Sequence, residues 1–422
     1  MLKRVNKAAY DMRMYIVFAI LLSLNSLAPG ILPFRGWGYV VYILFILYFY
    51  IRYPKKKYHL RRYMIYLACL LMLFLVNYIV SPYSSKPKYF IVGSFFTIIP
   101  FLTFLVTQKM NVTQRLVQKY VRHLISFALL LAFAILVETV ITGEASYECG
   151  ALKSNVFGLG FVSSFFNQIL VLSLIMYHQK RKKRRYLYFA LFMLTMVLLS
   201  IQIKAIVGSI MIVSAYFLIL VNLKRVVRYC LMTVIVGTII FLLSSNTMFM
   251  DKLSSYRNMY TIDTDGIARV QLYVASFEIA SDFFPLGTGQ GTFGSVPVNE
   301  YDSKVYDDYD LSGVYGLNDD YDVNFKLDTH WASVIGEQGI LGFLVYFALF
   351  IYPIVYLMKS LPKGKTKRIV AFFIVIPYLS MILESLVLPL PNRFCFIFIY
   401  SALSSMIVKL MKSKQLDKTI FK

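Results

Sequence analysis

Long apolar runs alternate with short polar connections along most of the sequence. Crossing the hydrocarbon core of a bilayer takes about 20 mostly apolar residues, and runs of this kind recur between residues 14 and 411. The pattern predicts about twelve transmembrane helices, at 14–33, 38–51, 63–80, 89–107, 123–142, 157–177, 186–201, 204–221, 229–245, 333–357, 369–388 and 394–411. The expected fold class is therefore all-α, a polytopic membrane protein with one large loop.

The composition agrees with a lipid environment. Charged residues make up only 15% of the chain, whereas soluble proteins carry about a quarter. No small-residue cleavage site follows the first apolar run, so we expect the first helix to stay as an anchor. A formal net charge of +23 would suggest nucleic acid as the partner of a soluble protein, but the positions of the charges give another explanation.

The charges predict the orientation of the chain. Of the 44 Lys and Arg residues, 33 lie in seven alternate connections, together with only two acids, Asp11 and Asp417. The long connection 246–332 instead holds 14 of the 21 acidic residues. Because basic connections stay in the cytoplasm, we expect both termini there and the long loop outside. The basic clusters then orient the chain and contact anionic lipid headgroups, and no nucleic acid is expected.

The long loop divides the chain into three parts: helices 1–9 (1–245), the outer loop (246–332), and helices 10–12 with a cytoplasmic tail (333–422). Apolar residues at helical spacing predict a helix over 265–284 inside the loop, with an apolar face toward the membrane surface or the bundle. A proline and three glycines end this helix: Pro285, Gly287, Gly289 and Gly291.

The second part of the loop, 297–328, is rich in Tyr and Asp. Three interpretations fit it: a solvated acidic surface, a sugar-contacting surface of Tyr faces and carboxylates, or a metal site. The run lacks the glycine and glutamate positions of an EF-hand, and the sequence has no Cys/His cluster. We therefore predict no metal site and no cofactor.

Three segments together resemble the O-antigen ligase and polymerase superfamily: GIARVQLYVASFEIASDFFPLGTGQGTFG (266–294), THWASVIGEQGILG (329–342) and GLGFVSSFFNQ (158–168). The resemblance implies a metal-independent glycosyltransferase of the bacterial cytoplasmic membrane. Its donor would be an undecaprenyl-pyrophosphate-linked oligosaccharide at the outer leaflet.

The leading interpretation is a polymerase of a surface polysaccharide such as O-antigen, capsule or exopolysaccharide, with a flippase and a chain-length regulator as possible partners. The alternatives are a ligase that moves a finished glycan, a flippase, and a scaffold of the cell envelope.

The leaving pyrophosphate of such a donor needs fixed cations. Arg269 falls in the first turn of the predicted loop helix, where backbone N–H groups and the helix dipole favour anions. Its guanidinium suits phosphate; alternatively, it pairs with a loop carboxylate such as Asp265. Lys204 and Arg393 lie at outer helix ends. Each either contacts the pyrophosphate as well or extends to the lipid headgroups.

His330 is the candidate catalytic base, because imidazole can take a proton from a sugar hydroxyl near neutral pH. Alternatively, it holds the pyrophosphate as a hydrogen-bond donor. Glu337 lies in the helix that follows and either orients the Arg or His side chains or acts as the base. Glu384 and Glu138 can each pair with a cation at a helix end. The glycines are expected to form a tight substrate loop that brings backbone near a ligand or another segment.

Overall fold

The computed structural model describes residues 2–28, 37–53, 60–83, 86–110, 113–142, 147–149, 151–179, 183–219, 268–317, 324–360 and 365–412. The predicted helix 229–245 and the beginning of the long loop, with Asp265, lie outside the described residues.

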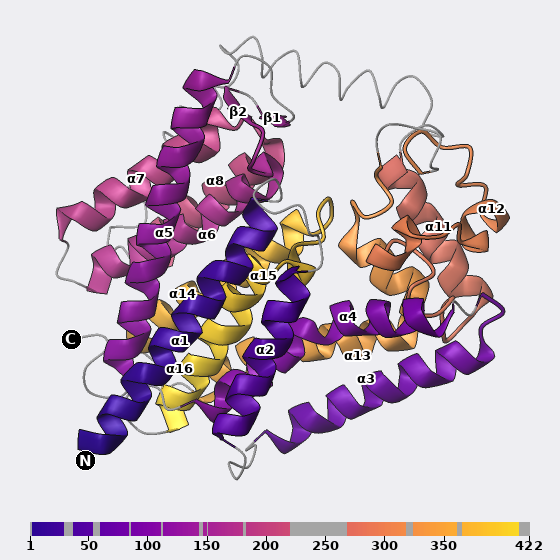
Figure 1. The fold of residues 1–422 in the computed structure, drawn as a ribbon, viewed down its shortest axis with the longest axis horizontal. Coiled ribbons are helices and arrows are strands. Elements are labelled where there is room, and N and C mark those ends of the chain that lie inside the picture. Colours follow the sequence, from indigo (N-terminus) through magenta and orange to yellow (C-terminus); the bar gives the residue numbers. More distant parts are fainter. Residues whose placement is uncertain are drawn as a thin grey trace.

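Most of the described chain is helical (Figure 1). The bundle contains α1 (Leu2–Leu27), α2 (Trp37–Arg52), α3 (Arg61–Val80), α4 (Pro87–Lys109), α5 (Gln114–Ile141), α6 (Leu159–Gln179), α7 (Arg184–Leu199), α8 (Ile203–Ile219), α13 (His330–Ser360), α14 (Lys365–Glu384), α15 (Phe394–Ile397) and α16 (Leu403–Lys412). Within the described residues, five helices are long and apolar enough to cross a membrane, namely α3, α4, α5, α6 and α13. The protein is therefore a predominantly helical, polytopic membrane protein.

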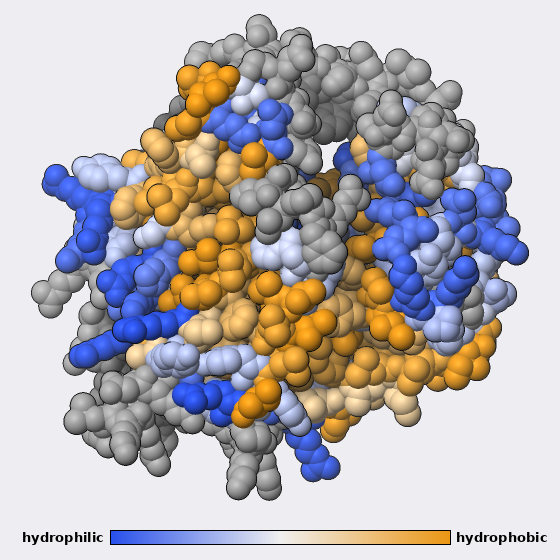
Figure 2. Space-filling view, in the orientation of Figure 1, coloured by the Kyte–Doolittle hydropathy of each residue, from blue (hydrophilic) through white to orange (hydrophobic). Residues whose placement is uncertain are grey.

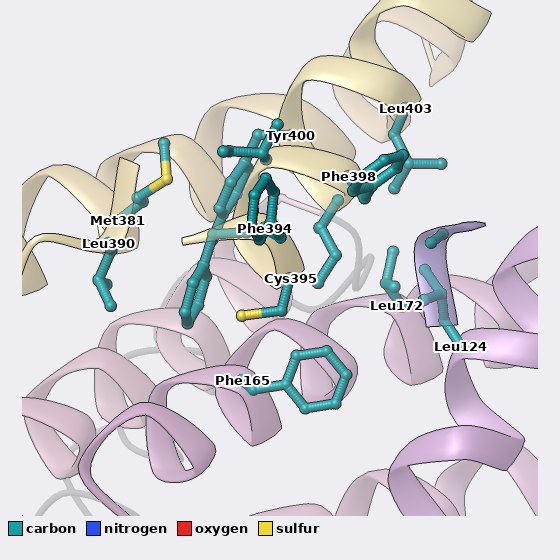
Figure 3. Close-up of a cluster of buried hydrophobic side chains, with 14 of the residues drawn as sticks. Leu124, Phe165, Leu172, Met381, Leu390, Phe394, Cys395, Phe398, Tyr400 and Leu403 are labelled. Atoms are coloured by element: carbon teal, nitrogen blue, oxygen red, sulfur yellow. The ribbon is translucent and has the colours of Figure 1, made fainter. Parts of the chain in front are cut away.

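Aromatic side chains fill much of the space between the helices. Tyr15 of α1 packs against Phe45 of α2 and Phe398, with ring centroids 5.9 and 5.4 Å away. Figure 3 shows Cys395 beside Phe165, where α15 lies close to α6. In contrast, α3 exposes a row of apolar side chains, as expected for a helix that faces lipid: Leu71, Met72, Leu75, Val76 and Ile79.

The last predicted helix, 394–411, is not regular. A 3₁₀ turn, η3 (Leu390–Asn392), precedes Arg393 and α15, and a π-helical turn, η4 (Phe398–Ala402), separates α15 from α16. Single π turns inserted in α-helices often occur at functional sites. The irregular segment therefore places Arg393 in a bend between helices.

A short β-hairpin lies at one end of α5 and was not predicted. Its strands, β1 (Tyr147–Cys149) and β2 (Leu152–Ser154), pair antiparallel. The Glu138 carboxylate binds the residues around β2, since it accepts hydrogen bonds from Ser154 Oγ at 2.6 Å and from the backbone N–H of Asn155 at 2.7 Å. Glu138 thus stabilises the hairpin rather than a cation of the candidate site.

Residues 268–317 and 324–329 form a small folded unit, here called the outer domain after the side of the membrane that the sequence predicts for it. It contains α11 (Ala268–Asp282), η2 (Val296–Asn299) and α12 (Lys304–Asp308). The Tyr- and Asp-rich segment packs with α11 and Phe293 around a shared apolar core: Leu272, Ile279, Phe293, Val298, Val305, Tyr306, Leu311, Val314 and Leu317. The described part of this segment is therefore packed around a core and is not simply a solvated acidic loop.

The outer domain lies at the end of the bundle away from the start of α1 and the end of α16 (Figure 1). Hydrophilic residues cover the region of α11 and α12, and a hydrophobic surface begins below it along α3 (Figure 2). Tyr83, just after α3, donates a hydrogen bond to Asp308 at 2.6 Å. Burial and this carboxylate raise the pKa of Tyr83 to about 12, which keeps its hydroxyl a donor.

Candidate functional site

The glycine turn (residues 286–294) is interlocked with the first turns of α13. Thr288 and Gly289 donate backbone hydrogen bonds to the carbonyls of Gly336 and Glu337, at 3.0 and 2.9 Å. A Cβ added to Gly287 would lie 2.2 Å from the Gly336 oxygen. Such a separation is shorter than any van der Waals contact, so only glycine fits at this crossing.

The kink in α13 belongs to the same interlock. Gly339 has φ 67° and ψ −173° inside the helix, a backbone conformation that residues with a Cβ rarely adopt. A Cβ at this position would lie 2.0 Å from the carbonyl oxygen of Leu286. The sequence Gly-Glu-Gln-Gly (336–339) therefore provides the space in which the glycine turn fits.

Glu337 anchors this turn through its carboxylate. The Glu337 side chain is only 2% exposed, and its Oε1 accepts hydrogen bonds from the backbone N–H groups of Gly291 and Phe293 and from Ser295 Oγ, at 2.9, 3.1 and 2.5 Å. A buried carboxylate is stabilised by such donors. These contacts favour an anchoring role for Glu337 over the role of catalytic base.

The glycine turn also contacts the ends of α3 and α4. Asn77 donates to the Glu337 carbonyl at 2.7 Å, and Ser81 donates to the Thr288 carbonyl at 2.6 Å. A Cβ added to Gly93 of α4 would lie 2.8 Å from the Gly291 nitrogen. The turn thus joins the outer domain to three helices, and this packing explains its glycines without a ligand.

We expect Gly287→Ala to lower the amount of folded protein, because the added methyl collides with backbone that cannot move independently. Overpacking of this kind costs about 1–3 kcal/mol or more. Gly313→Ala is the matched control, since nothing lies within 4 Å of the position of its added Cβ. Thermal unfolding of both purified variants is the measurement, and equal stability of the two would contradict the interlock.

Arg269, near the start of α11, pairs with Asp328. Its Nη2 lies 2.5 Å from Asp328 Oδ2, and its guanidinium lies over the Phe325 ring, 5.6 Å from the centroid. The Arg269 Nε is buried and has no hydrogen-bond partner in the described part of the chain. The carboxylate alternative raised for Arg269 is therefore present in the structure, with Asp328 as the partner.

Arg393, from another part of the chain, is within electrostatic range of the same carboxylate. Its guanidinium lies over the Phe161 ring, 4.2 Å from the centroid. Phe161 is in the first turn of α6. Arg393, in the bend before α15, therefore stacks on the start of α6 and interacts electrostatically with the outer domain.

Lys204 lies next to this group, at the beginning of α8. Its Nζ is 4.0 Å from the position that a Cβ on Gly160 would take, and Gly160 directly precedes Phe161. Lys204 interacts electrostatically with the buried Glu384 carboxylate, which also accepts a 2.7 Å hydrogen bond from Ser380. Of the two carboxylates considered as partners for a helix-end cation, Glu384 is thus the one near Lys204.

His330 is the first residue of α13, which begins three residues earlier than predicted. The ring is 3% exposed, and its Nε2 lies 3.0 Å from the Tyr346 hydroxyl. The backbone N–H of His330 donates to the Ser385 carbonyl at 3.3 Å, in the segment that leads to Arg393. His330 also follows Asp328 by two residues, so it shares one edge of the bundle with both arginines.

Residues 188–347 match the sequence model of a family described as O-antigen ligase. The match confirms the resemblance carried by the sequence motifs. It supports a function of the O-antigen ligase or polymerase type in surface glycan synthesis, with a lipid-linked oligosaccharide as substrate. No curated protein matches the chain.

The matched segment contains Lys204, Arg269 and His330, whereas Arg393 and Glu384 lie beyond it. Asp328, two residues before His330, pairs with Arg269 and interacts electrostatically with Arg393, and Lys204 lies beside Gly160, next to the Phe161 ring under Arg393. Glu337 and the glycine turn form a separate interlock. Among the described residues, no group of three or more His, Cys, Asp or Glu side chains is arranged to hold a metal ion.

Three side chains of the candidate site could not be identified from the sequence. In the sequence, Asp328 is only one residue of an acidic run. Its position two residues before His330 is the one feature that could have marked it as a site residue. Phe161 lies within the Gly-Phe motif at the start of α6, but nothing local indicates that an arginine stacks on it. Tyr346 is an aromatic residue in an aromatic helix, and no sequence signal separates it from its neighbours.

Proposed function

We propose that this protein polymerises undecaprenyl-pyrophosphate-linked repeat units into a surface polysaccharide, such as O-antigen, capsule or exopolysaccharide, at the outer face of the bacterial cytoplasmic membrane. The observation that carries the proposal is the link of Arg269 and Arg393 through Asp328, two residues before His330, in and beside a segment that matches the O-antigen ligase model. Lys204 lies beside Gly160, next to the Phe161 ring under Arg393. Each cation comes from a different element, so the fold assembles them.

The cations bind the donor pyrophosphate and stabilise it as it leaves. Arg269 offers a guanidinium with an unused Nε–H, which suits two oxygens of one phosphate. Arg393 and Lys204 add positive charge from two other elements of the fold. Fixed cations directed at developing negative charge are among the largest contributions to catalysis, and in this proposal they replace a divalent metal.

His330 takes the proton in the proposed reaction. The hydroxyl oxygen of the acceptor sugar attacks the anomeric carbon of the donor, and the bond from that carbon to the pyrophosphate oxygen breaks. The lipid pyrophosphate leaves with the electron pair, and the hydroxyl proton passes to a ring nitrogen of His330. If Nε2–H donates to Tyr346, Nδ1 carries the lone pair that a base needs.

A ligase would use the same donor site and differ only in the acceptor. Purified protein in lipid vesicles, supplied with the lipid-linked repeat unit alone, distinguishes the two. A ladder of products with increasing repeat number supports the polymerase. Transfer only after addition of a different acceptor would support the ligase, and no glycan transfer with either would reject the proposal. A flippase and a chain-length regulator are proposed as cellular partners.

The proposed topology places the outer domain outside the cell and the basic connections inside. We expect Gly313→Cys, in a background without the four native cysteines, to react with a membrane-impermeant maleimide in intact cells, because residue 313 is exposed. Lys183→Cys is the matched control, as it is also exposed but lies in a basic connection. Labelling of residue 183 in intact cells, with residue 313 protected until lysis, would show that the orientation is the reverse of the proposed one.

A further inference from the structure

The Asp328 carboxylate lies where the proposed function requires an anion to bind. It pairs with Arg269 of α11, and it interacts electrostatically with Arg393, which belongs to the bend before α15. The two arginines are far apart in the sequence, so the fold has placed one carboxylate in contact with Arg269 and within electrostatic range of Arg393. With no substrate present, this group keeps two like charges near each other.

The Asp328 contact leaves part of the Arg269 guanidinium unused. Only Nη2 donates to the carboxylate, and Nε is buried without a hydrogen-bond partner among the described residues. A carboxylate matched to arginine usually binds two of its N–H groups in parallel. An unpaired buried donor is costly, so the site is incomplete with Asp328 alone, and a phosphate oxygen can supply the missing acceptor.

Both partners can be reached from solvent. The Arg269 side chain is 38% exposed and the Asp328 side chain 23%, in contrast to the buried Glu337 carboxylate, which is surrounded by three donors. An ion pair at this level of exposure contributes little net stability. It can therefore open without disturbing the core of the outer domain.

We propose that Asp328 is a displaceable internal competitor for the pyrophosphate site: it holds Arg269 in position in the empty protein and gives way when the pyrophosphate of the donor binds. The inference rests on the proposed function. The Asp328 carboxylate stays close to the bound anion, so it weakens pyrophosphate binding and speeds release of the lipid pyrophosphate after transfer. Asp328 is accordingly a positioning residue and not a catalytic one.

The competing interpretation is a permanent ion pair, in which Asp328 stays on Arg269 while the pyrophosphate binds. The two interpretations predict opposite effects of Asp328→Asn, which preserves the shape of the side chain and removes its charge. Loss of a competitor tightens anion binding, whereas loss of a permanent support loosens Arg269 and weakens binding.

The test is calorimetric binding of inorganic pyrophosphate to the full-length protein in lipid nanodiscs. We expect Asp328→Asn to bind pyrophosphate about threefold to tenfold more tightly than the wild type, the range expected for removing a charge-assisted contact of this exposure. Asp282→Asn is the matched control. It removes the same charge at the other end of α11, about 20 Å from Arg269 along the helix axis. The affinity for pyrophosphate should be unchanged in this variant.

Steady-state turnover gives a second readout. With the lipid-linked donor, Asp328→Asn should lower KM and also lower kcat, because slower release of the product limits the cycle. Equal or weaker pyrophosphate binding by Asp328→Asn would overturn the competitor role, and so would an equal gain in Asp282→Asn. Failure of the wild type to transfer glycan would instead reject the proposed function, whatever the pyrophosphate affinities are.

Discussion

Arg269→Ala is expected to lower turnover by about a hundredfold or more, the size of loss seen when a donor to developing negative charge is removed. Protein level and folding should be normal, because the Asp328 carboxylate left behind is partly exposed and can be hydrated. Arg269→Lys should recover only part of the activity, since an ammonium group restores the charge but not the planar fork. Initial rates with purified protein and the lipid-linked donor are the measurement.

Lys304→Ala is the matched control for Arg269→Ala. It removes one positive charge from the same outer domain, at an exposed position of α12, and should keep nearly full activity. A similar loss in both variants would mean that the general charge of the outer domain matters and not the site. Full activity of Arg269→Ala would exclude Arg269 from the pyrophosphate site.

The sequence singled out Arg269, Lys204 and Arg393 as candidate site cations because the connections expected on the outer side hold few Lys and Arg residues. Their partners could not be predicted. Arg269 pairs with Asp328, 59 residues further along the chain. Arg393 interacts electrostatically with the same carboxylate from a bend that helical periodicity does not reveal. Asp265, the acid that is near in sequence, was the natural choice, because local patterns carry no information on tertiary contacts.

The glycines of the turn at 286–294 also show that local sequence patterns do not reveal tertiary contacts. Their spacing indicated a tight turn, but a substrate loop and a packing turn have the same sequence pattern. The close approaches of Gly287 to Gly336 and of Gly339 to Leu286 show that packing alone accounts for these glycines, and these contacts join segments about fifty residues apart. The β-hairpin and the π turn at 398–402 were missed because strands of three residues and single π turns leave no periodic signal.

His330→Gln distinguishes the two roles that the sequence left open for this histidine. The His330 Nε2 lies 3.0 Å from the Tyr346 hydroxyl, and both side chains are buried. Glutamine can still hydrogen-bond to Tyr346, but it cannot take a proton from the acceptor hydroxyl. If His330 is the base, turnover should fall about a hundredfold to ten-thousandfold, while binding of the lipid-linked donor is kept.

Tyr346→Phe tests the same assignment without touching the imidazole. In the base mechanism the Tyr346 oxygen accepts Nε2–H and thereby fixes the tautomer that leaves Nδ1 free. Phenylalanine leaves this N–H unpaired, at a cost of about 1–3 kcal/mol, which favours the tautomer protonated on Nδ1. We therefore expect Tyr346→Phe to lower turnover by about tenfold or more with little change in donor affinity.

The alternative is that His330 only holds the pyrophosphate as a hydrogen-bond donor. In that case His330→Gln keeps substantial turnover, because the glutamine amide is also a donor, and donor affinity falls more than the rate. His123→Gln serves as the matched control, since His123 is exposed on α5 near a basic connection and plays no part in either mechanism. Single-turnover rates and donor binding are measured for His330→Gln, Tyr346→Phe and His123→Gln. Together they distinguish a loss of proton transfer from a loss of pyrophosphate binding. Retained turnover together with weakened binding in His330→Gln would replace the base by a pyrophosphate-binding histidine.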